Sequence, residues 1–391
     1  MIKIDKKEKC CGCTACASIC PVNAITMTPD EEGFLYPVVD EVRCVDCGRC
    51  ETVCPIVQKF KLPEDHVGAF VAQSKEKEIL NECTSGGFAD AANRYVIECL
   101  DGCAIGVAFD DAFLPSHTIA DSYHEAKKFR NSKYAQSDLR GVFPRVRQLL
   151  ENGKVVLFTG TPCQVAGLKS FLKKDFTNLI CIDLVCRSVP SPRLWREYLE
   201  WQEQKYNSKI GSIACRKKTY GYHSGALEIE FENGRHYSGS NRVDYYMKLF
   251  HHDVCARPSC YSCAFKTQHR CSDITLFDSW NAAKIADEAF MDNDLGFTNV
   301  LVHTKKGHEL VKKIESVRYY ETTPEKMFRY TGGMEKNSVI KPETRESFYS
   351  DLGKMGFFDT AKKYVSVTMI DILIERLKPF KYALQKYYRK Q

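Results

Sequence analysis

Residues 155–164 read VVLFTGTPCQ and indicate the fold class of the larger part of the chain. The four apolar residues at the start are typical of a buried parallel strand. A helix-start signal follows directly, with Thr161 as the N-cap, Pro162 as the first helical residue and Gln164 as the reciprocal partner of a capping box. Cys163 falls in the first helical turn, where the helix dipole favours a thiolate. We therefore predict a strand, a turn and a helix of an α/β domain.

A second apolar run covers residues 179–185 and ends at Cys186, before a proline-rich turn and a helix over residues 194–203. Cys163 and Cys186 thus both follow buried strands. Ligands collect at the carboxyl ends of the strands in open α/β sheets, so we expect a site near these two cysteines. The remaining predicted strands lie at residues 67–72, at residues 102–109 and, as a β-hairpin insertion, within residues 210–240.

Two polar stretches also follow predicted strands. Gly86 and Gly87 precede a helix over residues 89–98, where glycines let a ligand approach the backbone and hydroxyls can bind phosphate oxygens. Residues 130–137 carry two cations and an aromatic side chain, which suits an anionic planar ligand such as a flavin nucleotide. The alternatives are an ordinary helix cap for the first stretch and a solvated loop for the second.

The first sixty residues carry the strongest motif. Residues 10–21 show the bacterial ferredoxin spacing Cys-x2-Cys-x2-Cys-x3-Cys-Pro, and residues 44–55 repeat it, with a small predicted hairpin between them. This pattern favours two 4Fe–4S clusters over zinc, whose sites usually combine close cysteine pairs with a long gap. Cys11 fits no ligand position and is expected to be a small buried residue. The first cluster would take Cys10, Cys13, Cys16 and Cys54, and the second would take Cys44, Cys47, Cys50 and Cys20.

A further pair, Cys260 and Cys263, is half of a metal site. One quartet adds Cys163 and Cys186 and would hold a third 4Fe–4S cluster beside the sheet. The rival quartet is local and would resemble structural zinc: Cys255, Cys260, Cys263 and Cys271. The first quartet is favoured because it explains the two cysteines at strand ends. Five isolated cysteines are expected in the core: Cys83, Cys99, Cys103, Cys181 and Cys215.

The composition is that of a globular chain. The 391 residues are 44% hydrophobic and 27% charged, and 20 of them are cysteines. In a reducing cytosol, that cysteine content is more typical of metal binding or redox chemistry than of disulfides. The net charge of +6 includes no concentrated basic face for nucleic acid. No uncharged apolar run reaches the ~18 residues of a membrane span, and residues 1–9 lack a secretory core, so we predict a cytoplasmic protein.

Together these motifs resemble one family, the coenzyme F420 hydrogenase/dehydrogenase beta subunits, in the form with a fused ferredoxin domain. The chain departs from the family pattern at two places. Arg187 and Ser188 stand where the family has His-Gly, and residues 277–281 read FDSWN where the family has Gly-Asp-x-Trp-Gly. The motifs that carry the resemblance are the two ferredoxin runs and residues 84–88, 130–137, 160–164, 186–192, 257–266 and 273–275.

The resemblance implies an FAD-binding flavoprotein that moves electrons between iron–sulfur clusters, flavin and a substrate. Archaeal members reduce the deazaflavin, plant relatives reduce 7-hydroxymethyl chlorophyll a, and many bacterial members lie beside polysaccharide-synthesis genes. We therefore expect an FAD- and iron–sulfur-dependent oxidoreductase with a small-molecule substrate, for example in polysaccharide biosynthesis, and a redox partner protein or reduced ferredoxin as donor. The alternatives are an electron-transfer subunit serving a separate catalytic partner and a ferredoxin domain fused to a zinc-stabilised adaptor. The expected FAD-binding residues are Ser85, Gly86, Gly87, Arg130, Lys133, Gln136 and Thr161.

The expected fold is an α+β ferredoxin-like two-cluster module followed by an α/β flavoprotein domain with a mixed sheet and a β-hairpin insertion. The predicted domains are residues 1–60 for the ferredoxin domain, residues 61–330 for the FAD-binding beta-subunit-like domain and residues 331–391 for a C-terminal helical tail.

The end of the tail is amphipathic. Residues 370–390 mix apolar and aromatic positions with six cations and two acids, and such helices can lie on an anionic membrane surface. One hypothesis is therefore contact with a membrane or a partner through this tail. The alternative, which we favour, is a terminal helix that covers the core. Pro379 is expected to break a long helix here.

Overall fold

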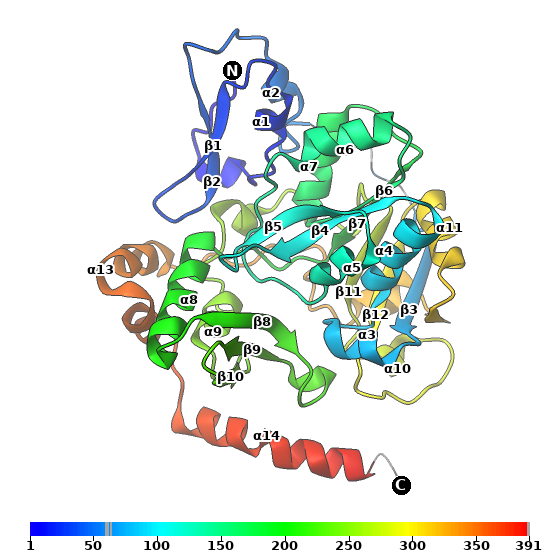
Figure 1. The fold of residues 1–391 in the computed structure, drawn as a ribbon, viewed down its shortest axis with the longest axis vertical. Coiled ribbons are helices and arrows are strands. Elements are labelled where there is room, and N and C mark those ends of the chain that lie inside the picture. Colours follow the sequence, from blue (N-terminus) through cyan, green and yellow to red (C-terminus); the bar gives the residue numbers. More distant parts are fainter. Residues whose placement is uncertain (59–61, 63–64, 389–391) are drawn as a thin grey trace.

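A computed structural model describes residues 1–58, 62 and 65–388 of the chain (Figure 1). At the top of Figure 1, the N-terminal module holds two antiparallel strands between the two cysteine runs, which confirms the predicted hairpin. Each run contains a short helix. The elements of the module are η1 (Lys7–Lys9), α1 (Ala15–Ile19), β1 (Ile25–Pro29), β2 (Leu35–Val39) and α2 (Arg49–Thr52).

An eight-stranded mixed sheet forms the centre of the chain, in the order β13-β3-β12-β11-β7-β6-β4-β5. The four strands β11, β7, β6 and β4 run parallel, and the strands on both sides of them pair antiparallel. The predicted mixed sheet is therefore confirmed. Its strands are β3 (Gly68–Ser74), β4 (Cys103–Phe109), β5 (Pro115–Ala120), β6 (Val156–Thr159), β7 (Leu179–Leu184), β11 (Ile274–Asp278), β12 (Thr298–Val302) and β13 (Val317–Glu321).

Helices cover both faces of this sheet, because alternate side chains of a strand point to opposite sides. Val156 and Phe158 of β6 pack with α6 and α7, whereas Leu157 between them packs with α4 on the other face. All three side chains are fully buried, which explains the continuous apolar run in the sequence. The helices of the two faces are α4 (Phe88–Cys99), α6 (Val142–Glu151), α7 (Pro162–Leu172) and α11 (Lys305–Lys313).

The predicted strand–turn–helix unit is confirmed at the β6–α7 junction. Pro162 opens α7, and Thr161 and Gln164 form the capping box, in which the Thr161 N–H donates to Gln164 Oε1 at 2.9 Å. Cys163 consequently lies in the first turn of α7, at the end of a central parallel strand. Cys99, by contrast, is exposed as the last residue of α4, so its expected place in the core is wrong.

A second, antiparallel sheet has three strands in the order β10-β9-β8, so the predicted two-stranded hairpin is one strand short. The chain reverses a second time at Gly234, whose φ of 79° suits a tight turn. The apolar side of this sheet shares a core with α8, α9 and α13. These elements are α8 (Pro192–Tyr206), β8 (Ile210–Lys217), β9 (Ala226–Phe231), β10 (His236–Gly239), α9 (Tyr245–His251) and α13 (Arg345–Tyr364).

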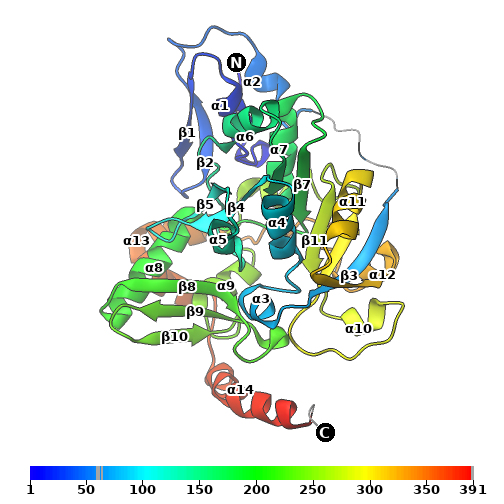
Figure 2. The same cartoon turned by 45° about the vertical axis from the view of Figure 1, so that its right-hand side comes forward.

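The last helix, α14 (Met369–Tyr388), lies below the three-stranded sheet in Figures 1 and 2. It continues through Pro379, so the predicted break is wrong; an exposed proline can be accommodated at the cost of one backbone hydrogen bond. Apolar side chains of α14 are exposed, including Ile370, Leu373 and Phe380, so this helix does not cover the core as we favoured. None of the described helices combines the length and apolar character needed to cross a bilayer.

The shorter elements connect these layers. They are α3 (Lys77–Glu82), α5 (Tyr123–Ala126), η2 (Lys127–Phe129), η3 (Tyr222–Ser224), η4 (Pro258–Ser262), α10 (Ala282–Ile285) and α12 (Pro324–Phe328). The domain boundaries proposed near residues 60 and 330 stay predictions.

Candidate functional site

The two cysteine runs share an unusual backbone conformation. In the first run, Gly12 and Thr14 flank the middle cysteine with φ values of 70° and 63°. In the second run, Asp46 and Gly48 flank the corresponding cysteine with φ values of 45° and 67°. Left-handed residues on both sides turn the chain sharply around that cysteine. The repeat in the sequence is therefore also a repeat in the backbone, which suits two equivalent cluster loops.

The cysteines of these loops lie near one another. Cys16 has Cys10, Cys54 and Cys50 as its charged neighbours, and burial followed by the repulsion from these thiolates raises the pKa of Cys16 to about 12. Buried thiols of this kind lose their protons when a metal binds them. The predicted exchange of the fourth cysteine between the two runs is consistent with this neighbourhood, since Cys54 lies close to the first run.

Backbone amides point at two of the sulfurs. The Ile2 N–H donates to Cys50 Sγ at 3.3 Å, and the Ala24 N–H donates to Cys20 Sγ at 3.2 Å. Hydrogen bonds to the sulfurs are one of the features that set the potentials of iron–sulfur clusters. Within the described residues, no three His, Cys, Asp or Glu side chains converge tightly enough for a single metal ion. The ligand set in the two runs is all thiol, which suits an iron–sulfur cluster.

A second group of cysteines forms where the β6–α7 and β7–α8 turns meet η4. The charged neighbours of Cys186 are Cys260, Cys163 and Cys263, and burial together with these thiols raises its pKa. Burial raises the pKa of Cys260 to about 12, with Cys163 and Cys263 adding to the rise. The structure therefore brings together the four cysteines predicted to hold a third cluster, from three separate segments of the chain.

The rival zinc quartet does not share one location. Cys255 is buried in the core around α8, α9 and α13. Cys271, which follows the Cys260–Cys263 pair in the sequence, packs instead against the core beneath α6 and α7. The structure thus supports the first quartet, and its metal content stays a prediction.

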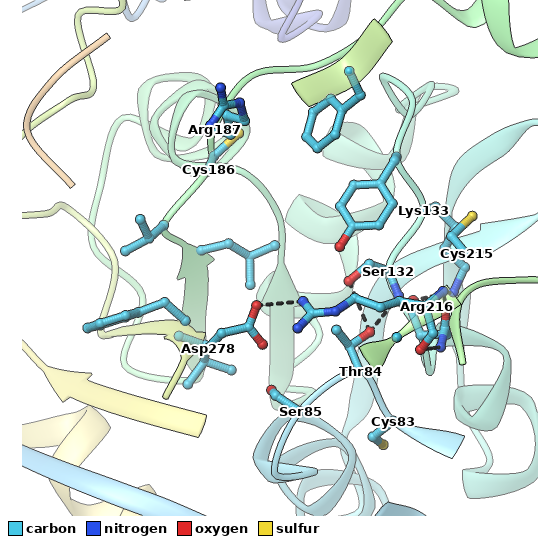
Figure 3. Close-up of a pocket in the computed structure, with 18 of the residues that line it drawn as sticks. Cys83, Thr84, Ser85, Ser132, Lys133, Cys186, Arg187, Cys215, Arg216 and Asp278 are labelled. Atoms are coloured by element: carbon cyan, nitrogen blue, oxygen red, sulfur yellow. Dashed lines mark hydrogen bonds and ion pairs between the residues drawn. The ribbon is translucent and has the colours of Figure 1, made fainter. Parts of the chain in front are cut away.

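A cavity of about 1150 Å³ opens beside this second group (Figure 3). Its wall includes Cys163, Cys186 and the carboxyl ends of β6, β7 and β11. This volume exceeds the ~300–1,000 Å³ usual for a small-ligand site. The charged wall residues include seven bases and two acids, which suits an anionic ligand: Arg130, Lys133, Arg187, Arg216, Arg242, Lys378, Lys381, Asp90 and Asp278.

Six of the seven expected FAD-binding residues line this cavity, and Gly86 does not. Gly86 instead packs against the sheet, where an added Cβ would lie 2.2 Å from the Ala72 carbonyl oxygen. Ser85 Oγ hydrogen-bonds with Thr298 Oγ1 at 2.8 Å, and Gly87 is the N-cap of α4 with a φ of 81°. The close packing of Gly86 and the positive φ of Gly87 therefore explain both glycines without a ligand.

The two expected cations are already bonded to the protein. Arg130 donates from Nε to Asp90 Oδ1 at 2.5 Å and from Nη2 to the Tyr123 hydroxyl at 2.7 Å. Lys133 Nζ donates to three carbonyl oxygens of its own loop, at 2.9, 2.7 and 3.2 Å, and burial lowers the pKa of Lys133 to about 8. Both side chains shape the loop of residues 128–133. Their contact with a flavin phosphate stays a prediction.

Gln136 also has protein partners, and they belong to the first cysteine run and to the segment before η4. Its Nε2 donates to the Cys11 carbonyl at 3.1 Å, and its Oε1 accepts from Arg257 Nη1 at 2.9 Å. Thr161 Oγ1 lies 3.2 Å from Cys163 Sγ. Gln136 and Thr161 therefore lie between the cavity and the cysteine groups.

An ion pair in the cavity wall was not predicted from the sequence. Arg216 of β8 donates from Nη1 to Asp278 Oδ2 at 2.5 Å, and its guanidinium lies 4.5 Å from the Trp280 ring (Figure 3). Its Nη2 is buried and has no hydrogen-bond partner among the described residues. Asp278 and Trp280 were visible as the FDSWN departure, but nothing in the sequence linked them to Arg216.

Two segments of the chain match models of known protein families. Residues 9–57 match the model of 4Fe–4S dicluster domains, and residues 153–327 match the model of the C-terminal part of coenzyme F420 hydrogenase/dehydrogenase beta subunits. Among solved structures, the chain is similar to one from the F420-reducing NiFe hydrogenase complex of Methanosarcina barkeri. The identity is 18%, the TM-score is 0.45, and the match covers 78% of this chain and 93% of that chain. A search of curated proteins found no match. The family resemblance noted in the sequence is confirmed.

Proposed function

With residues 153–327 in the coenzyme F420 hydrogenase/dehydrogenase beta-subunit family and residues 9–57 forming a 4Fe–4S dicluster domain, we propose an iron–sulfur flavoprotein oxidoreductase. The eight cysteines of the two ferredoxin runs would hold two clusters, and Cys163, Cys186, Cys260 and Cys263 would hold a third. FAD would bind in the cavity and exchange electrons with a small-molecule substrate. A place in polysaccharide biosynthesis is a further part of this proposal that rests on the family resemblance alone.

The cavity carries the proposal. An electron carrier needs only the ferredoxin module, whereas this chain builds a cationic cavity of about 1150 Å³ whose wall includes Cys163 and Cys186. A redox cofactor in the cavity would therefore lie next to the third cysteine group. Flavin supplies the two-electron chemistry, and the protein supplies binding, orientation and electrostatics.

The chain's own residues have definable tasks in this proposal. Arg216 would place a positive charge at the cavity wall, and Asp278 holds that guanidinium in place. The Trp280 ring contacts the same guanidinium, stacks on Tyr222 with ring centres 4.4 Å apart, and is 40% exposed at the cavity wall.

The second candidate function is an electron-transfer subunit that serves a separate catalytic partner. The exposed apolar side chains of α14 favour it, because contiguous exposed apolar groups often mark an interface. Anaerobic purification of the full chain, with iron, sulfide and flavin quantitation, tests the main proposal. Near-stoichiometric FAD supports a flavoprotein, whereas iron without flavin supports the electron-transfer role.

Replacing one cysteine of each run should remove one cluster at a time. We expect both Cys13→Ser and Cys47→Ser to lose about four irons per chain, because each cluster needs four thiolates. Cys11→Ser is the matched control, since Cys11 is a buried neighbour outside the ligand pattern. Iron and sulfide assays on anaerobic protein give the readout. Unchanged iron in both Cys13→Ser and Cys47→Ser would contradict the two-cluster assignment.

FAD retention should depend on the loop that Lys133 holds. Lys133→Gln removes donors from three carbonyls, so the loop of residues 128–133 should loosen and FAD should bind more weakly, by about tenfold if ~1.4 kcal/mol is lost. Lys128→Gln is the control, because this exposed lysine lies on the same loop and does not line the cavity. Flavin fluorescence during titration with FAD gives the affinity. If wild type and Lys133→Gln bind FAD with equal affinity, Lys133 does not contribute to the FAD site.

A further inference from the structure

Arg257 is completely buried directly before η4, the turn that carries Cys260. The hydrogen bonds of its side chain reach away from its own segment. Nε donates to the Cys10 carbonyl at 2.8 Å, Nη1 donates to Gln136 at 2.9 Å and Nη2 donates to the Leu35 carbonyl at 2.9 Å. The guanidinium also lies 4.3 Å from the centre of the Tyr36 ring. One side chain therefore joins the ferredoxin module to the segment that holds the third cysteine group.

The guanidinium has no carboxylate partner among the residues that the structure describes. A buried charge without a counter-ion is strongly unfavourable, and hydrogen bonds to neutral carbonyls offset only part of the cost. The group best placed to supply negative charge is a thiolate, since Nη2 lies 3.6 Å from Cys10 Sγ.

The second cysteine run lacks this feature. In the described part of the chain, no arginine donates a hydrogen bond to a sulfur of Cys44, Cys47, Cys50 or Cys20. Cys47 is exposed to solvent, whereas Cys13 packs against Gly167 of α7, with 2.9 Å from its Sγ to the position of an added Cβ. The two runs are thus equal in spacing and backbone but unequal in electrostatic surroundings.

We propose that Arg257 is a positioning residue that acts as the buried counter-ion of the cluster at Cys10, Cys13, Cys16 and Cys54. Its positive charge raises the reduction potential of that cluster above the potential of the cluster at the Cys44 run. The physical reason is that reduction adds a negative charge, which a nearby buried cation stabilises. The inference rests on the proposed iron–sulfur clusters. It predicts that their reduction potentials differ, although the cysteine spacing of the two runs is the same.

The test is a dithionite titration of the full-length protein, monitored by EPR spectroscopy, with iron content measured on the same samples. We expect Arg257→Gln to keep its iron and to shift one cluster's reduction equilibrium about tenfold against reduction, or about 59 mV for a one-electron couple. The shifted signal should be the one that is missing in Cys13→Ser. Arg257→Lys keeps the charge and should shift that signal less than Arg257→Gln does.

Arg345→Gln is the matched control, because Arg345 is buried at the same junction but bonds to Glu32 and the Ala256 carbonyl. It should shift the cluster potentials less than Arg257→Gln does. Equal potentials in wild type and Arg257→Gln, or equal shifts in Arg257→Gln and Arg257→Lys, would overturn the proposal. An equal shift in Arg345→Gln would also overturn it, since undocking of the module would then be the cause. If Arg257→Gln loses its iron, the test is the cluster potential of Arg257→Lys relative to wild type. Because Arg257→Lys keeps the positive charge, a potential shift in it larger than the shift in Arg345→Gln would refute a charge effect. Wild-type protein without iron would refute the clusters themselves, independently of Arg257.

Discussion

Cys163→Ala is expected to lower the iron content of anaerobically purified protein from about twelve to about eight atoms per chain. The reason is the meeting of three segments. Cys163 lies in the first turn of α7, Cys186 follows β7, and Cys260 and Cys263 belong to η4 and its end. Cys186 nevertheless has the other three as neighbours, and Cys260 has Cys163 and Cys263 as neighbours. A cluster with one thiolate ligand missing is lost or becomes labile, so we expect the protein to lose all of the iron of that cluster.

The matched comparison is Cys255→Ala, which belongs to the rival zinc quartet only. Because Cys255 lies in a different core, this variant should keep all of its iron and contain no zinc. Iron, sulfide and zinc are measured together on both variants, with thermal unfolding as a check of folding. Loss of zinc in Cys255→Ala with full iron in Cys163→Ala would reverse the assignment and leave a two-cluster protein with structural zinc.

Local signals in the sequence predicted their structures well. The ferredoxin spacing, the capping box at Thr161 and the apolar runs of β6 and β7 are all decided within a dozen residues. Their physical causes, which are chain reversal, helix-end hydrogen bonds and burial on both faces, act over the same short range. For this reason the module, the parallel strands and the position of Cys163 follow from the sequence alone.

The partners of polar side chains could not be predicted in the same way. Arg130 and Lys133 are the residue types that bind phosphate, but whether their donors are free depends on Asp90 in α4 and on carbonyls of the folded loop. Arg216 and Asp278 are 62 residues apart in the chain, and Arg257 and Cys10 are 247 apart. No period or spacing encodes such contacts, because they arise only when separate layers pack together.

The error at α14 has a related cause. The tail was amphipathic, and an amphipathic terminal helix usually places its apolar side on a core. Here Glu375 accepts hydrogen bonds from the N–H and hydroxyl of Ser240, at 3.0 and 2.7 Å, which holds the helix at the edge of the three-stranded sheet. Ile374 and Leu377 line the cavity, yet they are partly exposed, as are the other apolar residues of this helix, such as Leu373. The hydrogen bonds between Ser240 and Glu375 help to position this helix, and the hydrophobic pattern of the sequence does not predict them.

Arg345→Met should destabilise the junction between the ferredoxin module and the rest of the chain by about 3–5 kcal/mol. Arg345, at the start of α13, donates to both carboxylate oxygens of Glu32, at 2.8 and 2.5 Å, and to the Ala256 carbonyl at 2.9 Å. Both members of the pair are buried, with exposed fractions of 3% and 8%. Removing the guanidinium leaves the Glu32 carboxylate buried without its cation, at the turn between β1 and β2.

Three variants separate this buried pair from an ordinary surface pair. Lys341→Met breaks the exposed pair with Glu346 on the same helix and should cost about 0–1 kcal/mol, because solvent screens it. The double variant Glu32→Leu with Arg345→Met should recover most of the loss, since no unpaired charge remains buried. Urea unfolding followed by circular dichroism measures the free energy of unfolding, and limited proteolysis near residue 60 reports release of the module. If Arg345→Met is no less stable than Lys341→Met, the buried pair does not hold the module in place, and its docking rests on the other contacts of the junction, such as those of Arg257, of Gln136 with the Cys11 carbonyl and of Cys13 with Gly167.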